Sequence, residues 1–465
     1  MSHQQQSPQP FAAVINLGCV KNLVDSEVLL HQLTLAGFQL TAEPARAEVL
    51  VVNTCGFLES AVSEAIDTLL EAAGHKQTGA CRRLVAVGCM VQRYGKKLPQ
   101  LLPEVDLFIG TSFYQQFGRI LRAHLDGDPR RVWISRPNQN SDRRPDRIQA
   151  TPFYSAYVKI AEGCSNQCTF CMIPKLRGPY RSRTIDDIAG EVEELVAAGV
   201  REVNLVAQDT SRFGLDRDRP GSLARLLERL DQVRDLAWVR ILYTHPRQVT
   251  DDLLQTLAAS AKVVPYLDIP LQHCVPKVLR AMLREDAHPD PRRLLATIRE
   301  AIPGVAIRTS LMVGFPGETA DDFNHLLAFV EEVQFDHLGV FAFSAEPGSR
   351  AARLADRVPN AVGEHRRTEL MALQQRISRD RLRRYPGTVQ PVLVEGPHPE
   401  TELLVQGRMP TQAPEVDGVV LITEGELEIG RITPVRITAA HDYDLEGTPV
   451  LNPSTGPYHR FGPFE

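Results

Sequence analysis

YSAYVKIAEGCSNQCTFC, residues 154–171, joins a strand candidate to three closely spaced cysteines. The strand candidate is Tyr154–Ile160, and the cysteines follow it at once, where a loop begins. Amphipathic helical patterns and five more strand candidates come after this loop. These are Glu202–Ala207, Trp238–Tyr243, Val264–Ile269, Val305–Val313 and Leu338–Phe343. Six βα units are fewer than the eight of a closed barrel, so we expect a partial, TIM-like (β/α)6 barrel over residues 153–384.

A second βα series precedes this barrel. Its strand candidates are Ala12–Leu17, Glu48–Asn53, Arg83–Gly88 and Val105–Gly110. Alternating strands and helices of this kind predict a parallel sheet covered by helices, here a flavodoxin- or Rossmann-like domain over residues 11–126. Residues 127–152 are rich in Pro, Asp, Asn and Arg, which favours an interdomain linker with solvated basic side chains over a long loop within one domain.

The C-terminal part of the chain has a different pattern. A highly charged helix candidate, Glu364–Arg384, is followed by short alternating strands with Gly and Pro between them. They predict a small antiparallel β-barrel over residues 385–451. This segment holds 11 acidic residues and three arginines, whereas the net charge of the whole chain is only −5. We expect an α/β protein of three domains, with a disordered tail at 1–10 and another tail at 452–465.

Composition excludes several classes of protein. The 465 residues are 43% hydrophobic and 23% charged, which is typical of a folded protein and not of a disordered one. There is no apolar run long enough to span a bilayer, and the polar N-terminus lacks the apolar core of a secretory signal. We therefore expect a cytoplasmic protein with no membrane partner. Its eight cysteines are then buried thiols or metal ligands, not a disulfide framework.

Cys164, Cys168 and Cys171 form a C-x3-C-x2-C motif that can wrap one metal centre. Zinc usually takes four protein ligands, and the next Cys or His residues are distant, at His245 and Cys274. Three thiolates suit an iron–sulfur cluster with one open iron position. A zinc site completed from afar and a chance clustering of thiols are the alternatives.

Three cysteines of the first domain also share a position relative to the strands. Cys19, Cys55 and Cys89 each lie just beyond the carboxyl end of a predicted parallel strand, where open α/β sheets bind ligands. They can therefore converge on a second cluster, although three small buried hydrophobic residues are an alternative. Cys81 and Cys274 are expected to be non-ligands.

The two cysteine sets together resemble those of the radical S-adenosylmethionine (SAM) methylthiotransferases. The resemblance covers residues 11–451 and implies a methylthiotransferase N-terminal domain, a radical SAM core and a C-terminal TRAM domain. It rests on LGCVKNLVDSE, VVNTCGF, VGCMVQRYG, EGCSNQCTFCMIPKLRGPYRSR, NLVAQDTSRFG, PLQHC, RTSLMVGFPGET and FAFSAEPGSRAA.

The resemblance implies two 4Fe–4S clusters and SAM as cofactors. The auxiliary cluster is assigned to Cys19, Cys55 and Cys89, and the SAM-binding cluster to Cys164, Cys168 and Cys171. The auxiliary cluster's open iron would carry the sulfur to be inserted. One SAM would donate a methyl group, and a second would supply the 5′-deoxyadenosyl radical that abstracts a substrate hydrogen.

The resemblance implies further contacts to SAM less directly, from the residue before the third cysteine of the motif and from residues on or just after the barrel strands. The candidates are Phe170, Gln208, Asp209, Arg308, Gly314 and Glu318. The structural alternatives are a turn and acidic helix start, loop capping and an ion pair with an acidic helix. Arg177, Arg181 and Arg183 form a basic run, by default a solvated loop and otherwise an attraction for an aspartate-bearing substrate.

Members of this family modify either tRNA adenosines or the β-carbon of an aspartate in ribosomal protein S-twelve. The motifs GCVKNLVDSE and CTFCMIPKLRGPYRSR resemble the ribosomal-protein branch. An acidic C-terminal domain would repel RNA phosphates and suit a basic protein, although an acidic face can simply aid solubility. We expect S-twelve as partner, free or in the small ribosomal subunit. The alternatives are a tRNA substrate, and a non-catalytic metal-binding protein associated with translation. The sulfur donor and the electron donor stay open.

Overall fold

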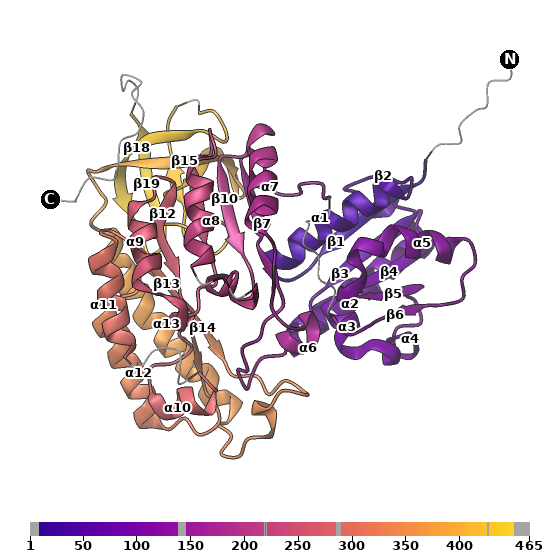
Figure 1. Cartoon of the computed structure of the whole chain (residues 1–465), viewed down its shortest axis with the longest axis horizontal. Coiled ribbons are helices and arrows are strands. Elements are labelled where there is room, and N and C mark those ends of the chain that lie inside the picture. Colours follow the sequence, from indigo (N-terminus) through magenta and orange to yellow (C-terminus); the bar gives the residue numbers. More distant parts are fainter. Residues whose placement is uncertain are drawn as a thin grey trace.

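The computed structural model describes residues 9–137, 146–217, 219, 221–284, 290–425 and 427–450 (Figure 1). Residues 1–8, the predicted tail at 452–465 and the middle of the predicted linker, residues 138–145, lie outside this description. The domain boundaries expected from the sequence stay a prediction.

The N-terminal domain is a parallel sheet of six strands in the order β2-β1-β3-β4-β5-β6 (Figure 1). The strands are β1 (Phe11–Asn16), β2 (Gln39–Leu40), β3 (Val49–Thr54), β4 (Arg83–Gly88), β5 (Leu107–Gly110) and β6 (Val132–Trp133). Helices cover both faces, and they are α1 (Val20–Leu35), α2 (Glu59–Thr78), α3 (Cys89–Tyr94), α4 (Leu98–Leu101) and α5 (Phe117–Leu125). Residues of α1 and α5 form the core on one face, and residues of α2 and α3 form it on the other. The expected flavodoxin-like order is confirmed.

Part of the predicted linker belongs to this sheet. The edge strand β6 pairs in parallel with β5, so the apolar residues Val132 and Trp133 extend the first domain. Arg147 is not solvated, as was expected of the linker's basic residues. It is buried and forms ion pairs with Glu27 of α1 and with Glu191. The expectation of a solvated linker was therefore wrong for Arg147, because its carboxylate partners lie on other elements.

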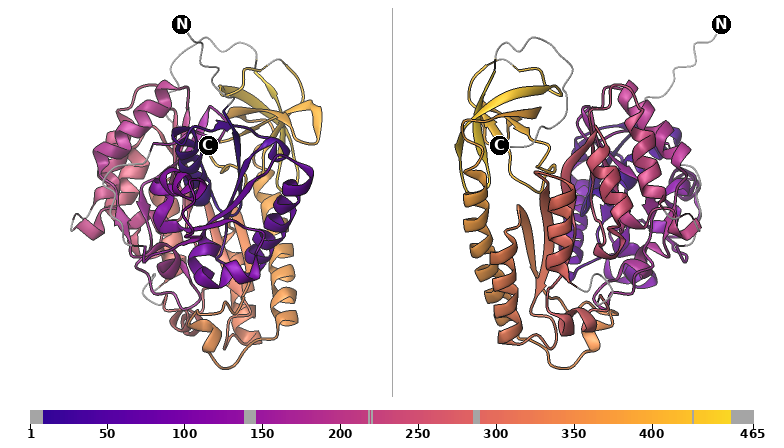
Figure 2. Two further views of the ribbon diagram at one scale, coloured as in Figure 1. Left: turned by 90° about the vertical axis from the view of Figure 1, so that its right-hand side faces the viewer. Right: turned by 60° about the vertical axis from the view of Figure 1, so that its left-hand side comes forward.

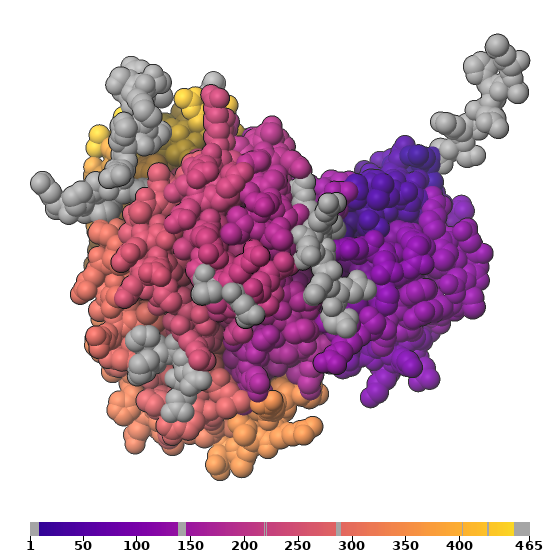
Figure 3. Space-filling view, viewed as in Figure 1, coloured from indigo at the N-terminus to yellow at the C-terminus, as the bar shows by residue number. Residues whose placement is uncertain are grey.

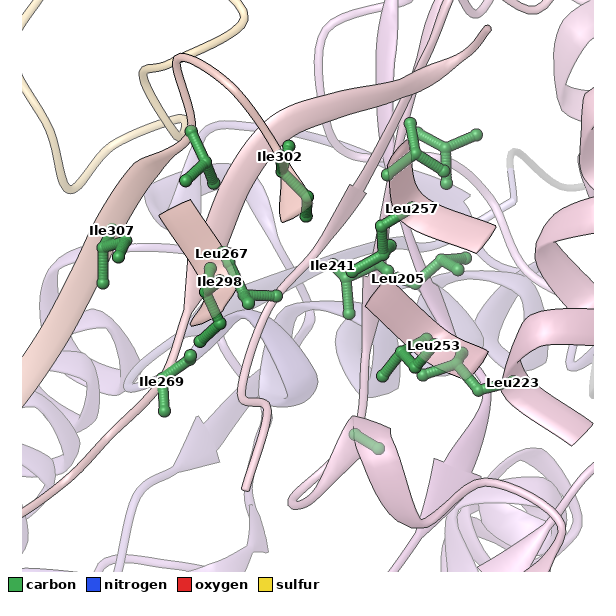
Figure 4. Close-up of a cluster of buried hydrophobic side chains, with 14 of the residues drawn as sticks. Leu205, Leu223, Ile241, Leu253, Leu257, Leu267, Ile269, Ile298, Ile302 and Ile307 are labelled. Carbon is green, nitrogen blue, oxygen red and sulfur yellow. The ribbon is translucent and has the colours of Figure 1, made fainter. Parts of the chain in front are cut away.

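The second sheet has six parallel strands in the order β14-β13-β12-β11-β10-β7 and does not close (Figure 2). They are β7 (Ser155–Lys159), β10 (Glu202–Val206), β11 (Trp238–Ile241), β12 (Val263–Asp268), β13 (Ala306–Val313) and β14 (His337–Ala342). The outer helices are α7 (Ile185–Ala197), α8 (Ser222–Asp231), α9 (Asp251–Ala259), α11 (Pro291–Ala301), α12 (Ala320–Val333) and α13 (Asn360–Leu382). Alternate strand residues such as Leu205, Ile241 and Leu267 pack against these helices (Figure 4). The predicted partial barrel is confirmed.

Short elements at the mouth of the partial barrel complete it. The strands β8 (Ala161–Glu162) and β9 (Arg181–Ser182) pair antiparallel, and the helices are α6 (Ile173–Arg177) and α10 (Pro276–Ala281). In Figure 1, α6 lies beside the N-terminal domain. No helix among the described residues is both long and apolar enough to cross a membrane.

The C-terminal domain is a closed β-barrel in the order β15-β16-β17-β19-β18. Its strands are β15 (Val389–His398), β16 (Thr401–Arg408), β17 (Val420–Ile422), β18 (Ile432–Ala440) and β19 (Leu445–Pro449). The small barrel was predicted, but it is not antiparallel throughout, because β17 and β19 pair in parallel.

A buried ion network joins this small barrel to the second sheet. Glu202 of β10 binds Arg240 of β11 at 3.0 Å and Arg408 of β16 at 2.6 Å. Burial alone would raise the pKa of Glu202, but Arg408 and Arg240 lower it to about 2. The C-terminal domain is thus docked through charges that are hidden from water.

Candidate active site

Three cysteines meet at the carboxyl edge of the N-terminal sheet. Cys19 precedes α1, Cys55 follows β3, and Cys89 begins α3. A Cβ atom on Gly18 would lie 2.9 Å from the Cβ of Cys55. One on Gly56 would lie 2.6 Å from the backbone carbon of Cys89, so both loops need glycine to approach so closely. Because β1 and β3 are adjacent here, the cysteines lie at the switch point where such sheets bind ligands.

The three thiols of this auxiliary triad differ in exposure. Cys19 is exposed, Cys55 is half-buried and Cys89 is buried. Burial raises the pKa of Cys55 and raises that of Cys89 to about 12, and the neighbouring Cys19 adds to both shifts. Neither thiol therefore ionises on its own near neutral pH. Metal binding deprotonates cysteine, so an iron centre bound here would hold these thiols as thiolates.

The second triad, Cys164, Cys168 and Cys171, lies in the loop between β8 and α6. The amide of Ile173 donates to Sγ of Cys171 at 3.4 Å, and Nη1 of Arg284 donates to Sγ of Cys168 at 3.5 Å. Hydrogen bonds to ligand sulfurs are one of the means by which proteins set cluster potentials. Burial raises the pKa of Cys164 to about 11 and that of Cys171 to about 12.

The loop that carries this triad is anchored across the mouth of the barrel. Asn166 donates to Asp209, beyond β10, at 2.8 Å. The backbone amide of Thr169 donates to the carbonyl of Met282, after α10, and the carbonyl of Thr169 accepts from Ala351. The loop thus starts after β8 and is held by residues that follow β10, α10 and β14. These anchors fix its cysteines over the strand ends.

A cavity of about 1040 Å³ opens beside the second triad. All three of its cysteines line the cavity, as do Gln92 and Lys96 of the N-terminal domain. Residues Gly348–Arg350, after β14, also line the cavity. The volume exceeds the 300–1,000 Å³ of typical small-molecule sites, so a cluster and a SAM-sized molecule can both be accommodated.

A smaller cavity of about 400 Å³ lies on the other side of Cys168. Arg212, Arg284 and His245 line it. The Nε atoms of Arg212 and Arg284 are buried there without a hydrogen-bond partner among the described residues, as is Oε1 of Gln208 nearby. Buried polar atoms are normally satisfied, so these orphans indicate a polar ligand or ordered water.

Arg177 of α6 connects the two triads. Its Nε donates to Sγ of Cys89 at 3.3 Å, and its Nη1 pairs with Asp25 of α1. Cys89 also packs with Met172 and Leu176, which follow Cys171 in the chain. Cys89 of the first triad and the loop of the second triad are therefore in direct contact across the domain boundary.

The same boundary holds further buried charges. Lys159, at the end of β7, pairs with Asp25 and with Glu162, and Gln208 donates to Glu162 at 3.0 Å. Burial would raise the pKa of Glu162, but Lys159 and Arg177 lower it. The carboxylates of Asp25 and Glu162 thus neutralise the cations that link the domains.

A second link between the domains runs from α3 to the loop after β14. Arg93 pairs with Glu346 at 2.9 Å, and both side chains are at most 4% exposed. Arg93 also donates to the carbonyls of Gly56 and Phe57, and Glu346 accepts from the amide of Glu59 at the start of α2. This ion pair therefore fixes the Cys55 loop against the barrel.

The structure gives Phe170 and Gln208 positions near the second triad. Phe170 packs on a small hydrophobic cluster that includes Met282 and Phe315. Gln208 follows β10 and is held by Glu162, with its Oε1 unpartnered. A contact with SAM stays a prediction for both residues.

The other predicted SAM contacts are engaged elsewhere. Arg308 binds Asp417 of the C-terminal barrel at 2.7 Å. Glu318 binds Arg366 of α13 at 2.8 Å and caps the amide of Phe315. Gly314 has φ +72° and lies against Gly363, so its turn packs on α13. The contacts of Glu318 and Gly314 match their structural alternative, a turn at a helix start, whereas Arg308 pairs with an aspartate that lies outside any helix. A SAM contact for the three residues stays a prediction.

Two arginines of the basic run are not solvated. Arg177 is buried, and Arg183 pairs with Asp187 and Glu191. The default expectation of a solvated loop was wrong for them because every acidic partner lies on another element or further along the chain. Arg284 and Arg93 were not predicted as site residues. Each stands alone in an ordinary helical or loop segment, so no sequence pattern marked them.

The donor chemistry fits iron–sulfur clusters. Among the described residues, no three His, Cys, Asp or Glu side chains are grouped so as to hold a single metal ion. Each triad offers soft thiols, and N–H donors reach the sulfurs of both. Cys81 instead packs in the core under α2, and Cys274 packs against the barrel core, as expected of non-ligands.

Three family models match successive parts of the chain. Residues 12–110 match the uncharacterized protein family UPF0004, residues 158–330 match the radical SAM superfamily, and residues 387–450 match the TRAM domain. Among solved structures, the radical SAM methyltransferase TsrM from Kitasatospora setae is similar with a TM-score of 0.56. That match has 15% identity over 74% of this chain and 77% of TsrM, so it supports the fold alone.

Curated relatives match nearly the whole chain. The protein from Syntrophobacter fumaroxidans named ribosomal protein uS12 methylthiotransferase RimO is 56% identical over 94% of this chain and 97% of its own length. Proteins of the same name from Syntrophotalea carbinolica and Geobacter sulfurreducens are 47% and 46% identical, over 94% of this chain and 96% and 97% of their own lengths. The chain therefore belongs to the RimO family of ribosomal protein uS12 methylthiotransferases.

Proposed function

We propose that this protein inserts a methylthio group at the β-carbon of an aspartate in ribosomal protein uS12, in the cytoplasm. The observation that carries the proposal is the contact between two cysteine triads. Cys89 of one packs against Met172, the residue after Cys171 of the other. A radical made at one site and a sulfur held at the other can then reach the same substrate atom.

Cys164, Cys168 and Cys171 would hold one 4Fe–4S cluster, and Cys19, Cys55 and Cys89 would hold a second. A cluster at the first site would supply the one-electron chemistry that cleaves SAM, and a cluster at the second would supply an open iron for the sulfur to be transferred. Arg284 and the Ile173 amide orient two sulfurs of the first site. Arg177 does so for Cys89 at the second site.

The charge of the C-terminal barrel supports a basic protein substrate. Residues 386–451 contain 11 acidic residues and three arginines. Arg408 and Asp417 are both buried in ion pairs, so the acidic excess of the outer surface comes from the other residues. Such a surface attracts a basic ribosomal protein and repels RNA phosphates. The names of the curated relatives, which specify uS12, agree with this.

The proposal is tested with anaerobically reconstituted enzyme, SAM, a sulfur source, a low-potential reductant and purified uS12. Mass spectrometry of the product should show one methylthio group in place of one hydrogen on an aspartate. Iron analysis should give about eight irons per chain, as expected for two four-iron clusters. Zinc in place of iron, or uS12 that stays unmodified while tRNA gains the group, would contradict the proposal.

A further inference from the structure

Lys21 places an ammonium group between the auxiliary triad and the barrel mouth. It lies two residues after Cys19, in the first turn of α1. Its Nζ atom lies 3.2 Å from the centre of the Tyr243 ring, just beyond β11. Lys21 is only 9% exposed, whereas the neighbouring Cys19 is exposed. A buried cation therefore lies beside the cysteine that is most open to a substrate.

Lys21 differs from the other buried cations at the domain boundary. Lys159 and Arg177 share the carboxylate of Asp25, and Arg93 binds Glu346. For Lys21, no carboxylate oxygen of a described residue lies within ion-pairing distance, 4.0 Å. Its closest interaction is with an aromatic ring, which holds a cation without neutralising its charge.

Asp268 of β12, the carboxylate that interacts electrostatically with Lys21 from the barrel, is already engaged. It accepts a hydrogen bond from the amide of Tyr243 at 2.8 Å and lies 3.9 Å from Arg308. The charge of Lys21 is thus left available to a group that enters from outside.

The backbone of Tyr243 is strained and is held in place by hydrogen bonds. Its φ is +64°, an unusual conformation for a non-glycine residue. Its amide is fixed by Asp268, and its carbonyl accepts from Thr210. Strained backbone that the surroundings over-determine clusters at ligand sites. Here the strain presents the ring face to the ammonium of Lys21.

We propose that Lys21 binds the side-chain carboxylate of the aspartate that is modified, an inference that rests on the proposed function. The carboxylate is one bond from the reacting β-carbon, so it must enter the mouth together with that carbon. A carboxylate buried there without a partner would be strongly disfavoured. The ammonium offers three donors and an uncompensated positive charge, which selects aspartate over the neutral, similarly shaped asparagine.

The test compares the wild type with Lys21→Met, Lys21→Arg and Lys97→Met, each as reconstituted holoenzyme. Lys21→Met keeps an apolar stem against Tyr243 and removes the charge, Lys21→Arg keeps the charge, and Lys97 is an exposed lysine outside both cavities. The substrates are uS12 with the target aspartate or with asparagine in its place. The readouts are kcat/KM for methylthiolation, affinity for both proteins, iron content and SAM cleavage without substrate.

Lys21→Met should lower kcat/KM for the aspartate protein by about 10- to 100-fold, the range of a lost hydrogen bond to a charged group. The affinity of the Lys21→Met enzyme for the aspartate protein should fall to its affinity for the asparagine protein. The affinity for the asparagine protein should equal that of the wild type. Lys21→Arg should retain part of the preference for aspartate over asparagine, and Lys97→Met should retain all of it. Iron content and SAM cleavage without substrate should be unchanged in all three variants.

Two outcomes would overturn the role of Lys21. One is a Lys21→Met enzyme that prefers aspartate as strongly as the wild type does. The other is a wild type that binds both proteins equally well. If the wild type modifies no uS12 at all, the proposed function itself fails, and this result is distinct from both.

Discussion

Arg177 is the side chain through which the barrel touches the auxiliary triad. Replacing it by Met would leave Asp25 buried without this partner and remove the donor to Cys89. Because Lys159 still pairs with Asp25, we expect a loss of about 1.5–3 kcal/mol in unfolding free energy, the range of a lost hydrogen bond to a charged group. The auxiliary cluster's potential should also become more negative, because a donor to its ligand sulfur is lost.

Denaturant unfolding and a redox titration of the auxiliary cluster measure these two effects. Arg82→Met is the matched control, since Arg82 lies on the same domain and its exposed side chain pairs with Glu48. That control should cost less than about 1 kcal/mol and leave the potential unchanged. An unaltered potential in Arg177→Met would contradict the assigned contact.

Cys164→Ala should separate the two clusters. Because Cys164 belongs only to the second triad, the variant should lose SAM cleavage and retain about four of eight irons, those of the auxiliary cluster. Iron analysis and chromatographic detection of 5′-deoxyadenosine check this outcome. SAM cleavage at the wild-type rate would show that Cys164 is not a ligand.

The cysteines could be predicted from the sequence because their spacing and their place after strands are local features. The partners of the basic run could not. Arg177 meets Asp25 and Asn22 of α1, more than 150 residues earlier in the chain. Only the packing of the two domains brings these groups together, so the burial of Arg177 has no signature near it in the sequence.

At the scale of elements, long and strongly patterned segments were predicted and two-residue strands were not. The strands β3 and β4 are apolar runs with a clear boundary, whereas β2 and β6 have two residues each. Such short pairs depend on the neighbouring strand for their conformation. The parallel closure between β17 and β19 likewise depends on barrel geometry, which alternating hydrophobicity does not encode.

Glu202 should make the docking of the C-terminal barrel sensitive to acid. Arg408 and Arg240 hold its folded pKa at about 2, below the ordinary value of 4.5. A depressed carboxyl pKa contributes stability that is fully present above pH 4.5 and is lost as the pH falls toward 2. Glu202→Gln should remove this contribution at every pH. It would leave Arg240 buried without its carboxylate partner and Arg408 paired with Glu395 alone, at a cost of about 3–5 kcal/mol.

Hydrogen exchange of β15 to β19 between pH 3 and 7 measures this docking. The wild type should lose protection as the pH falls from 4.5, and the variant should be poorly protected already at pH 7. Glu48→Gln, which removes a partly exposed partner of Arg82, serves as the control. Equal protection of the wild type and Glu202→Gln at pH 7 would show that the buried network does not dock the barrel.

At the scale of the whole molecule, the N-terminal domain meets the barrel along one side (Figure 3). The Arg93–Glu346 pair spans this boundary next to the Cys55 loop. Glu346→Gln should leave both clusters loaded but misplace one against the other. Since a shift of about 1 Å can cost on the order of 100-fold in rate, we expect at least tenfold less product per SAM cleaved. Parallel assays of modified uS12 and 5′-deoxyadenosine measure that ratio, and an unchanged ratio would contradict the role of the pair.

The proposed function requires that this protein modifies uS12 and not tRNA. It is tested most directly in cells that lack its gene, by mass spectrometry of both uS12 and tRNA. Loss of the methylthio group from the uS12 aspartate, restored by the wild-type gene and not by a Cys164→Ala copy, is the predicted result. An unchanged uS12 together with loss of a methylthio group from tRNA adenosines would contradict uS12 as the substrate.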